Sequence, residues 1–164
     1  LKLLEEPPEL VHFILTAHSV EPLLPTIRSR VQHVHILPIS DVQSGEIAEA
    51  SPHRDQLLFI ANGRPAELMR LLADNTYFSH ESRRFRAAKT FLAASRYDRL
   101  IMITAISSRL EMLRFIDTLT VVARASLAST PRADTIQLLE SLLATRQTLA
   151  ANGNVKLQAL RTVV

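Results

Sequence analysis

The sequence predicts a mainly helical protein with a small α/β segment near its start, and three observations support this fold class. Three glycines in 164 residues are too few for the many tight turns of a sheet-rich fold. Through residues 77–164, apolar residues recur at the spacing of amphipathic helices. Short apolar runs typical of buried strands occur only before Pro38.

Residues 1–38 are expected to contain two strands with a helix between them. Residues 1–6 have the pattern of a helix end, which the prolines at positions 7 and 8 stop because proline lacks the amide donor. The apolar runs at residues 11–16 and 31–37 predict strands, and residues 22–28 predict a short helix. Two strands cannot cover their own faces, so we expect the missing strands upstream. Without them, we expect partial disorder or pairing with a second copy of the chain through open strand edges.

Residues 39–76 predict a small bundle of three short helices. These helices are expected at residues 41–50, 52–61 and 64–73, the first with Ser40 or Asp41 as its N-cap. Asn62-Gly63 ends the second helix with residues that tolerate left-handed backbone, and a proline opens the third.

Residues 77–164 predict a second, longer helical domain. Its helices are expected at residues 79–94, 96–107, 110–128, 133–151 and 155–164. In the helix at residues 133–151, the side expected to be buried consists of Ile136, Leu139, Leu142, Leu143 and Leu149.

The composition excludes several classes of protein. A hydrophobic fraction of 47% excludes intrinsic disorder, which requires low hydrophobicity and high net charge. The absence of cysteine excludes a disulfide-stapled scaffold, a thiolate metal site and a cysteine nucleophile. No stretch approaches the roughly 20 apolar residues of a membrane span. The chain begins at Leu1 inside an expected helix, so we expect it to be the C-terminal part of a longer protein.

The net charge of +3 conceals an uneven distribution. Residues 77–164 carry 13 Lys and Arg against 6 Asp and Glu, so this region is basic enough to meet nucleic acid. Only Arg83, Arg84 and Arg86 cluster, and no aromatic residues alternate with the arginines as a stacking groove requires. We therefore favour a solvated helical surface and rank a standalone nucleic-acid-binding module lower.

The sequence lacks the common catalytic motifs. It contains no P-loop, no dinucleotide-binding glycine motif, no His-Glu-x-x-His and no nucleophile elbow. His33 and His35 would share one face of a strand, but no cysteine or suitably spaced carboxylate completes a zinc site there. The glutamates at positions 5, 6 and 9 are interpreted as a solvated helix end, since nothing nearby supplies a matching metal ligand.

Three ordered motifs occur near the start of the chain: L-L-E-E-P-P-E at residues 3–9, F-I-L at residues 13–15 and L-L-P-T-I-R-S-R at residues 23–30. Together they resemble the bacterial clamp-loader subunits of DNA polymerase III, which are AAA+ proteins with a sensor strand and a helix bearing a Ser-Arg-Cys motif. Here Ser29-Arg30-Val31 keeps the serine and the arginine and replaces the cysteine. Weaker similarities follow: residues 61–65 resemble the lid-domain turn and residues 154–157 the start of the last collar helix.

The resemblance implies an order of domains. Residues 1–38 would be the remnant of the AAA+ base domain, and residues 39–76 would be the helical lid. Residues 77–164 would be the helical collar through which subunits assemble. No cofactor is implied in this chain itself: ATP would be bound by neighbouring subunits, and any zinc site would lie upstream.

The resemblance also implies a site. Arg30 would act in trans as an arginine finger on the γ-phosphate of a neighbour's ATP, because a guanidinium stays charged and forks around phosphate oxygens. Ser29 would support it, and Pro25 and Thr26 would shape the helix that aims it. Without the flanking motifs, Arg28 and Arg30 would be interpreted as helix-terminal cations favoured by the helix dipole. Because the motifs are present, we prefer the arginine finger to this simpler interpretation.

Two departures from the motor pattern distinguish the kind of subunit. The gamma/tau motor has A-T-T-D-P after its sensor strand, whereas residues 16–20 here are T-A-H-S-V. Ala66 takes the place of the motor's lid arginine. The two phosphate-sensing groups of the motor are the threonine of A-T-T-D-P and the lid arginine. Because both are lost here and Arg30 is kept, the resemblance implies the delta-prime kind, which hydrolyses no ATP itself. Arg64 as a substitute sensor keeps gamma/tau as the alternative.

The implied function is a non-catalytic role in DNA replication. The chain would be a cytoplasmic component of the DNA-directed DNA polymerase III holoenzyme, a nucleotidyltransferase, and would help to load the sliding clamp on primed DNA. Its partners would be the gamma/tau and delta subunits, bound through the collar, with the clamp and DNA met indirectly and no membrane involved.

Overall fold

The computed structural model describes residues 3, 6, 8–17, 20 and 23–163. The chain forms two compact units, Leu1–Leu37 and Pro38–Val164. The expectation of a mainly helical protein is confirmed, because helices account for most of the second unit. The expected helix end at residues 1–6 lies largely outside the described residues.

The two strands expected in the first unit are not formed, and this prediction was wrong for the described residues. Residues 11–16 and 31–37 are without regular secondary structure, and the described residues between them include the four-residue helix α2 (Pro25–Arg28). A strand exists only where its amide and carbonyl groups pair with a neighbour. Neither segment pairs in this way, and their apolar side chains remain exposed, Ile14 by 89% and Ile36 by 86%.

Three short helices open the second unit, close to their expected positions: α3 (Asp41–Ile47), α4 (Arg54–Ala61) and α5 (Pro65–Ala73). Ser40 begins α3 with a capping box, in which its side chain accepts from the Gln43 amide and the Gln43 side chain accepts from the Ser40 amide. These local bonds explain why the start of α3 could be predicted from sequence, whereas its end falls at Ile47 and not at the expected residue 50.

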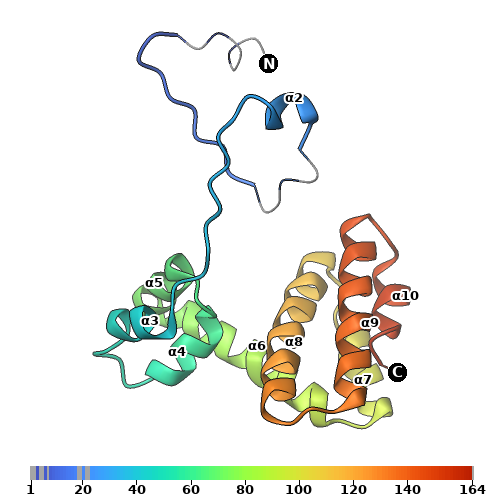
Figure 1. Cartoon of the computed structure of the whole chain (residues 1–164). Coiled ribbons are helices and arrows are strands. Elements are labelled where there is room, and N and C mark those ends of the chain that lie inside the picture. Colours follow the sequence, from blue (N-terminus) through green and yellow to red (C-terminus); the bar gives the residue numbers. More distant parts are fainter. Residues whose placement is uncertain (1–2, 4–5, 7, 18–19, 21–22, 164) are drawn as a thin grey trace. The chain divides into compact units, whose positions relative to one another are not determined.

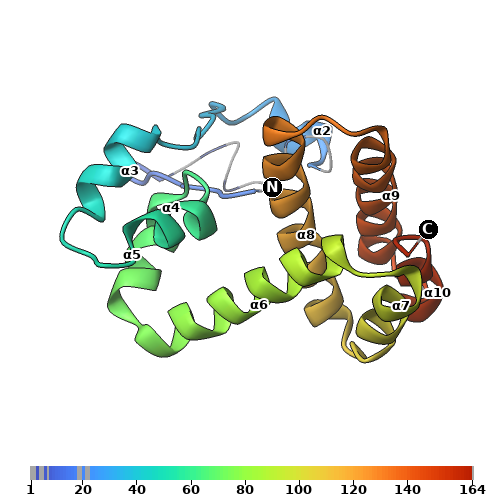
Figure 2. The ribbon, with the colours of Figure 1, turned by 90° about the horizontal axis from the view of Figure 1, so that it is seen from below.

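The 19-residue helix α6 (Asn75–Ala93) connects two groups of helices within the second unit. The helices α3 to α5 gather at its N-terminal half and α7 to α10 at its C-terminal half (Figures 1 and 2). It starts four residues before the predicted Ser79 because the Asp74 carboxylate caps it, accepting from the amides of Thr76 and Tyr77 at 2.9 Å each. The predicted boundary between residues 76 and 77 therefore falls within its first turn.

The second group comprises α7 (Arg96–Thr104), α8 (Arg109–Ser129), α9 (Ala133–Ala150) and α10 (Val155–Leu160). Phe91 of α6 and Phe115 of α8 meet edge to face, with ring centroids 5.8 Å apart. Around them lie fully buried side chains from α8 and α9, among them Met112, Ile116 and Leu142. This core fixes α6 against α8.

The buried side of α9 differs in part from the prediction. Leu142 and Leu149 are buried as expected, whereas Ile136 is 48% exposed and Leu143 is 44% exposed. Leu138 and Thr145 take buried positions instead, the threonine hydroxyl donating to the Gln158 carbonyl at 3.4 Å. Within the described part of the chain, no helix is both long and apolar enough to cross a membrane.

Candidate functional site

The segment that carries Ser29 and Arg30 begins with a proline. Pro25 occupies the first position of α2, where its missing amide costs nothing and its fixed φ angle favours a helix. Ser29 ends the helix, its amide donating to the Pro25 carbonyl, and the Arg30 amide donates to the Ile27 carbonyl at 3.0 Å. Both side chains are exposed. Arg30 is thus held just beyond a single helical turn.

The Arg30 guanidinium binds back onto this turn. Its Nη1 donates to the Thr26 carbonyl at 2.8 Å and lies 3.3 Å from the Ser29 hydroxyl, which itself donates to the Thr26 carbonyl at 3.3 Å. The Ser29 and Arg30 side chains therefore donate to the same acceptor, the Thr26 carbonyl oxygen. Sequence reasoning named Thr26 for its place in the helix but missed its carbonyl oxygen, because main-chain groups leave no signal in residue identity.

A hollow of about 610 Å³ lies beside Arg30 within the first unit. Apolar side chains of residues 11–15 and 31–34 form much of its wall, with Leu23 and Ile27 from around α2. Among the described residues that line it, Arg30 is the sole Lys, Arg, Asp or Glu.

Arg64, the substitute phosphate sensor of the gamma/tau alternative, binds main-chain carbonyls. Its Nε donates to the Ala61 carbonyl at 3.0 Å and its Nη2 to the Ile60 carbonyl at 3.2 Å, so it caps the C-terminus of α4. Ala66 lies exposed in the first turn of α5, and its methyl group has no donor for a phosphate. The turn between α4 and α5 therefore offers a phosphate only the Arg64 guanidinium, which already binds two carbonyls.

The histidines and acidic residues form no metal centre in the described part of the chain. No group of three His, Asp or Glu side chains there converges at a distance suited to a metal ion. The His33 Nε2 atom lies 3.2 Å from the Arg28 carbonyl oxygen. His33 and His35 belong to the extended segment after α2, not to a strand with a defined face.

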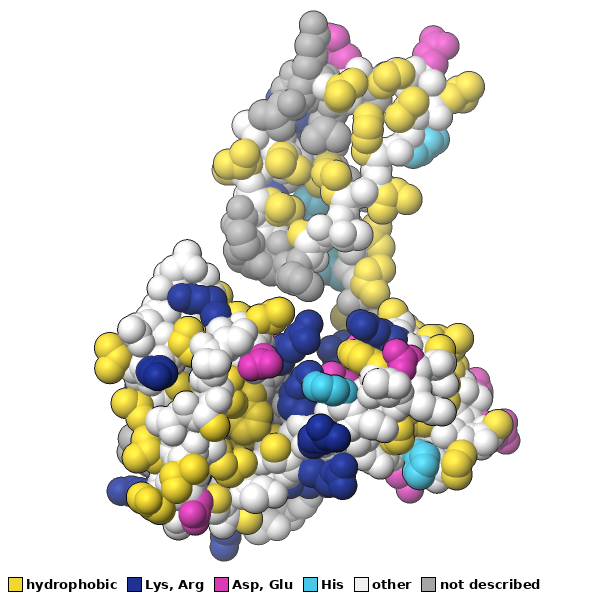
Figure 3. Space-filling view, turned by 180° about the vertical axis from the view of Figure 1, so that it is seen from behind, with side chains coloured by type: hydrophobic (Ala, Val, Ile, Leu, Met, Phe, Trp, Pro, Cys, Tyr) yellow, Lys and Arg dark blue, Asp and Glu magenta, His cyan; other side chains and the backbone are white. Residues whose placement is uncertain are grey.

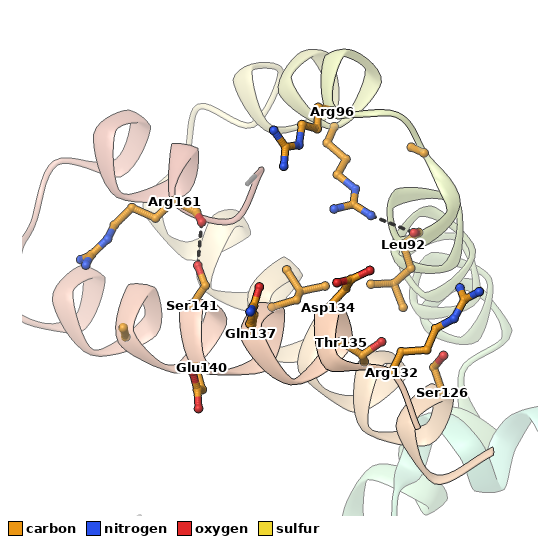
Figure 4. A pocket seen from close by; sticks show the side chains of 14 residues that line it. Leu92, Arg96, Ser126, Arg132, Asp134, Thr135, Gln137, Glu140, Ser141 and Arg161 are labelled. Atoms are coloured by element: carbon orange, nitrogen blue, oxygen red, sulfur yellow. Dashed lines mark hydrogen bonds between the residues drawn. The ribbon is translucent and has the colours of Figure 1, made fainter. Parts of the chain in front are cut away.

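A larger groove, of about 860 Å³, lies between the end of α6, the start of α7 and the first turns of α9. Some of its polar groups hold the fold. Arg99 donates to the carbonyls of Phe91 and Leu92, and the Ser141 hydroxyl donates to the Arg161 carbonyl at 2.6 Å (Figure 4). Arg132 and Asp134 at the start of α9 add one charge of each sign. This mixed lining lacks a nucleophile paired with a base.

Comparison with protein families gives a match at the end of the chain that carries Arg30. Residues 1–40 match the protein family described as "DNA polymerase III, delta subunit". The matched segment includes α2, Ser29 and Arg30 and leaves residues 41–164 outside the match. No curated protein and no solved structure matches the chain. The match supports a relationship to DNA polymerase III subunits, and it does not distinguish the delta-prime kind from gamma/tau.

Proposed function

We propose that this chain is part of a clamp-loader subunit of DNA polymerase III and that Arg30 acts on ATP bound by a neighbouring subunit. The observation that carries the proposal is the family match over residues 1–40, since this segment contains the Ser29-Arg30 pair. The exposed guanidinium at the end of α2 has the geometry of a side chain that can turn from its own helix to a partner's phosphate. On binding, the Thr26 carbonyl would be exchanged for phosphate oxygens, which are stronger acceptors.

The role of Arg30 is electrostatic in this proposal. ATP hydrolysis builds negative charge on the oxygens around the γ-phosphorus, and a guanidinium placed against them stabilises that charge without accepting a proton. The Ser29 hydroxyl, 3.3 Å from Arg30 Nη1, would limit the rotation of the guanidinium. The helices of residues 77–164 would bind other subunits of the loader.

The test is a reconstituted clamp loader that contains Arg30→Ala. We expect the ATP site served by Arg30 to lose on the order of 10³-fold in turnover, with assembly of the complex unchanged by size-exclusion chromatography. Arg30→Lys keeps the charge but not the fork, so it should recover only part of the rate. Arg28→Ala removes a neighbouring exposed cation and serves as the matched control. Unchanged DNA-stimulated ATPase activity in Arg30→Ala would remove the assignment.

We propose the delta-prime kind over gamma/tau because Ala66 stands at the position of the motor's lid arginine and its methyl group has no donor for a phosphate. Arg64, the possible substitute, donates to two carbonyls at the end of α4, which gives it a structural role in this turn. We therefore expect Arg64→Ala to lower the melting temperature of the chain and to leave the ATPase activity of the reconstituted loader unchanged. A loss of ATPase activity at unchanged stability would instead favour a motor subunit.

A further inference from the structure

One side of α6 carries cations and hydroxyl groups but no carboxylate. The opposite side packs against both groups of helices, for example through Ser82, which accepts from Gln56 of α4 at 2.8 Å, and through Phe91. We use the term α6 stripe for seven exposed residues: Thr76, Ser79, His80, Arg83, Arg86, Lys89 and Thr90. Their spacing of three and four residues places most of them on one face of the helix.

The positive charge of the α6 stripe is not neutralised on its own helix. The single acidic residue of α6, Glu81, is 5% exposed and pairs with Arg84 at 2.8 Å. Arg83 and Arg86 form no hydrogen bond or ion pair with any residue that the structure describes. Both guanidiniums are therefore available to an anion from outside.

The α6 stripe is also long and rigidly held. At 1.5 Å per residue, the distance from Thr76 to Thr90 along the helix is about 21 Å. Lys89 at its edge is steadied by the ring of Phe59, with Nζ 5.2 Å from the ring centroid. Figure 3 shows Lys and Arg side chains gathered across the middle of the second unit, between its two groups of helices. The sequence shows the cluster of Arg83, Arg84 and Arg86 but not that Arg83 and Arg86 are exposed while Arg84 pairs with the buried Glu81.

We propose that the α6 stripe binds the phosphate backbone of double-stranded nucleic acid without reading its sequence. Arg, Lys, Ser and Thr side chains are among those that contact phosphates in protein–DNA interfaces, and they make up all of the stripe except His80. An acidic protein partner is disfavoured, because protein interfaces bury aromatic or large apolar residues at their centre and the stripe has none. Base stacking is disfavoured because the stripe carries no Phe, Tyr or Trp.

The test is binding of the 164-residue chain to labelled mixed-sequence duplexes of DNA and of RNA, measured by fluorescence anisotropy between roughly 50 and 200 mM salt. Replacing both arginines, Arg83→Gln with Arg86→Gln, should weaken binding by about 10-fold and reduce the log–log salt slope by about 2. Substitution of both by Lys should keep the affinity within about 3-fold, because a phosphate contact needs the charge more than the fork. The matched control is Arg96→Gln with Arg132→Gln, which removes the same charge outside the stripe and should change binding little.

Several outcomes would overturn the proposal. They are the binding of neither duplex, an unchanged salt slope in the Arg83 and Arg86 variant, an equal loss in the control, and tighter binding of polyglutamate than of either duplex. Circular dichroism of each variant checks that α6 still folds, which is expected because glutamine is a good helix former. The proposal does not depend on Arg30, so the ATPase and the binding experiments can fail separately.

Discussion

Tyr77 joins α5 to α6 through both its hydroxyl group and its ring. Its hydroxyl donates to Glu67 Oε1 at 2.8 Å, and the Arg70 guanidinium carbon lies 3.9 Å from the ring centroid. Partial burial, followed by the hydrogen bond to Glu67, raises the pKa of Tyr77 above its ordinary value, and the Arg70 charge opposes this effect. The folded chain therefore holds the phenol in its neutral form more strongly than the unfolded chain does.

We expect this to make stability depend on pH in the alkaline range. The contribution of Tyr77 is complete below about pH 10, where the phenol is neutral in both states. It is lost as the pH rises further, because the unfolded chain ionises first. Tyr77→Phe should cost about 1 kcal/mol at neutral pH through the lost hydrogen bond and should show a smaller further loss above pH 10. Urea unfolding at neutral and alkaline pH measures the free energy of unfolding of the unchanged chain and of the variant. If the variant lost as much stability above pH 10 as the unchanged chain does, the expectation would be contradicted.

Among the elements, the turn between α4 and α5 depends most on a single residue. Gly63 has a φ angle of +72°, and its carbonyl accepts from the Ile39 amide at 2.8 Å. A Cβ atom at this position would lie 2.7 Å from Pro38 Cβ and 3.1 Å from the Ile39 carbonyl oxygen. The turn thus requires both the conformation and the small size of glycine.

Gly63→Ala is therefore expected to destabilise the chain by about 2 kcal/mol or more, since left-handed backbone alone costs 1–2 kcal/mol in a residue with a Cβ atom. Asn62→Gly is the control: Asn62 also has a positive φ angle, of 50°, and glycine adopts it readily, so stability should change by less than about 1 kcal/mol. Thermal melts of the two variants measure both changes in stability. A Gly63→Ala melting temperature equal to that of the unchanged chain would show that the turn can relax.

At the scale of the whole molecule, the described hydrophobic core draws only on the unit Pro38–Val164. Its members run from Ala48 to Ala159. In the described part of the first unit, large apolar side chains are instead exposed, such as Leu10 at 96% and Leu37 at 77%. The free energy of folding should therefore reside in the second unit, because buried apolar area provides most of it.

Removal of residues 1–37 is accordingly expected to leave a cooperative thermal transition whose midpoint shifts by no more than about 2 °C, corresponding to less than 1 kcal/mol. Calorimetry of the 164-residue and shortened chains makes the comparison. A non-cooperative transition in the shortened chain, or a much lower midpoint, would place part of the core in the first unit.

The sequence by itself determined most helix bounds, since the signals that set them are local. Pro65 starts α5, Ser40 caps α3, and Asn154 caps α10 by accepting from the Leu157 amide at 3.1 Å. The helix expected at residues 22–28 is an exception, since α2 begins at Pro25. Such bonds join residues only a few positions apart, so residue identity and order are sufficient to predict them. The Ser29-Arg30 motif is equally local, and its conversion into a shared contact at Thr26 follows from one helical turn.

Only the tertiary structure decided features that join distant residues. The two predicted strands failed because strand formation depends on a partner, not on the segment itself. The burial of Thr145 depends on the Gln158 carbonyl, and the exposed side of α6 is defined by the helices α4, α5 and α8 that cover the rest of it. Periodicity specifies which residues share a helix face, but packing against other elements selects the face that remains open.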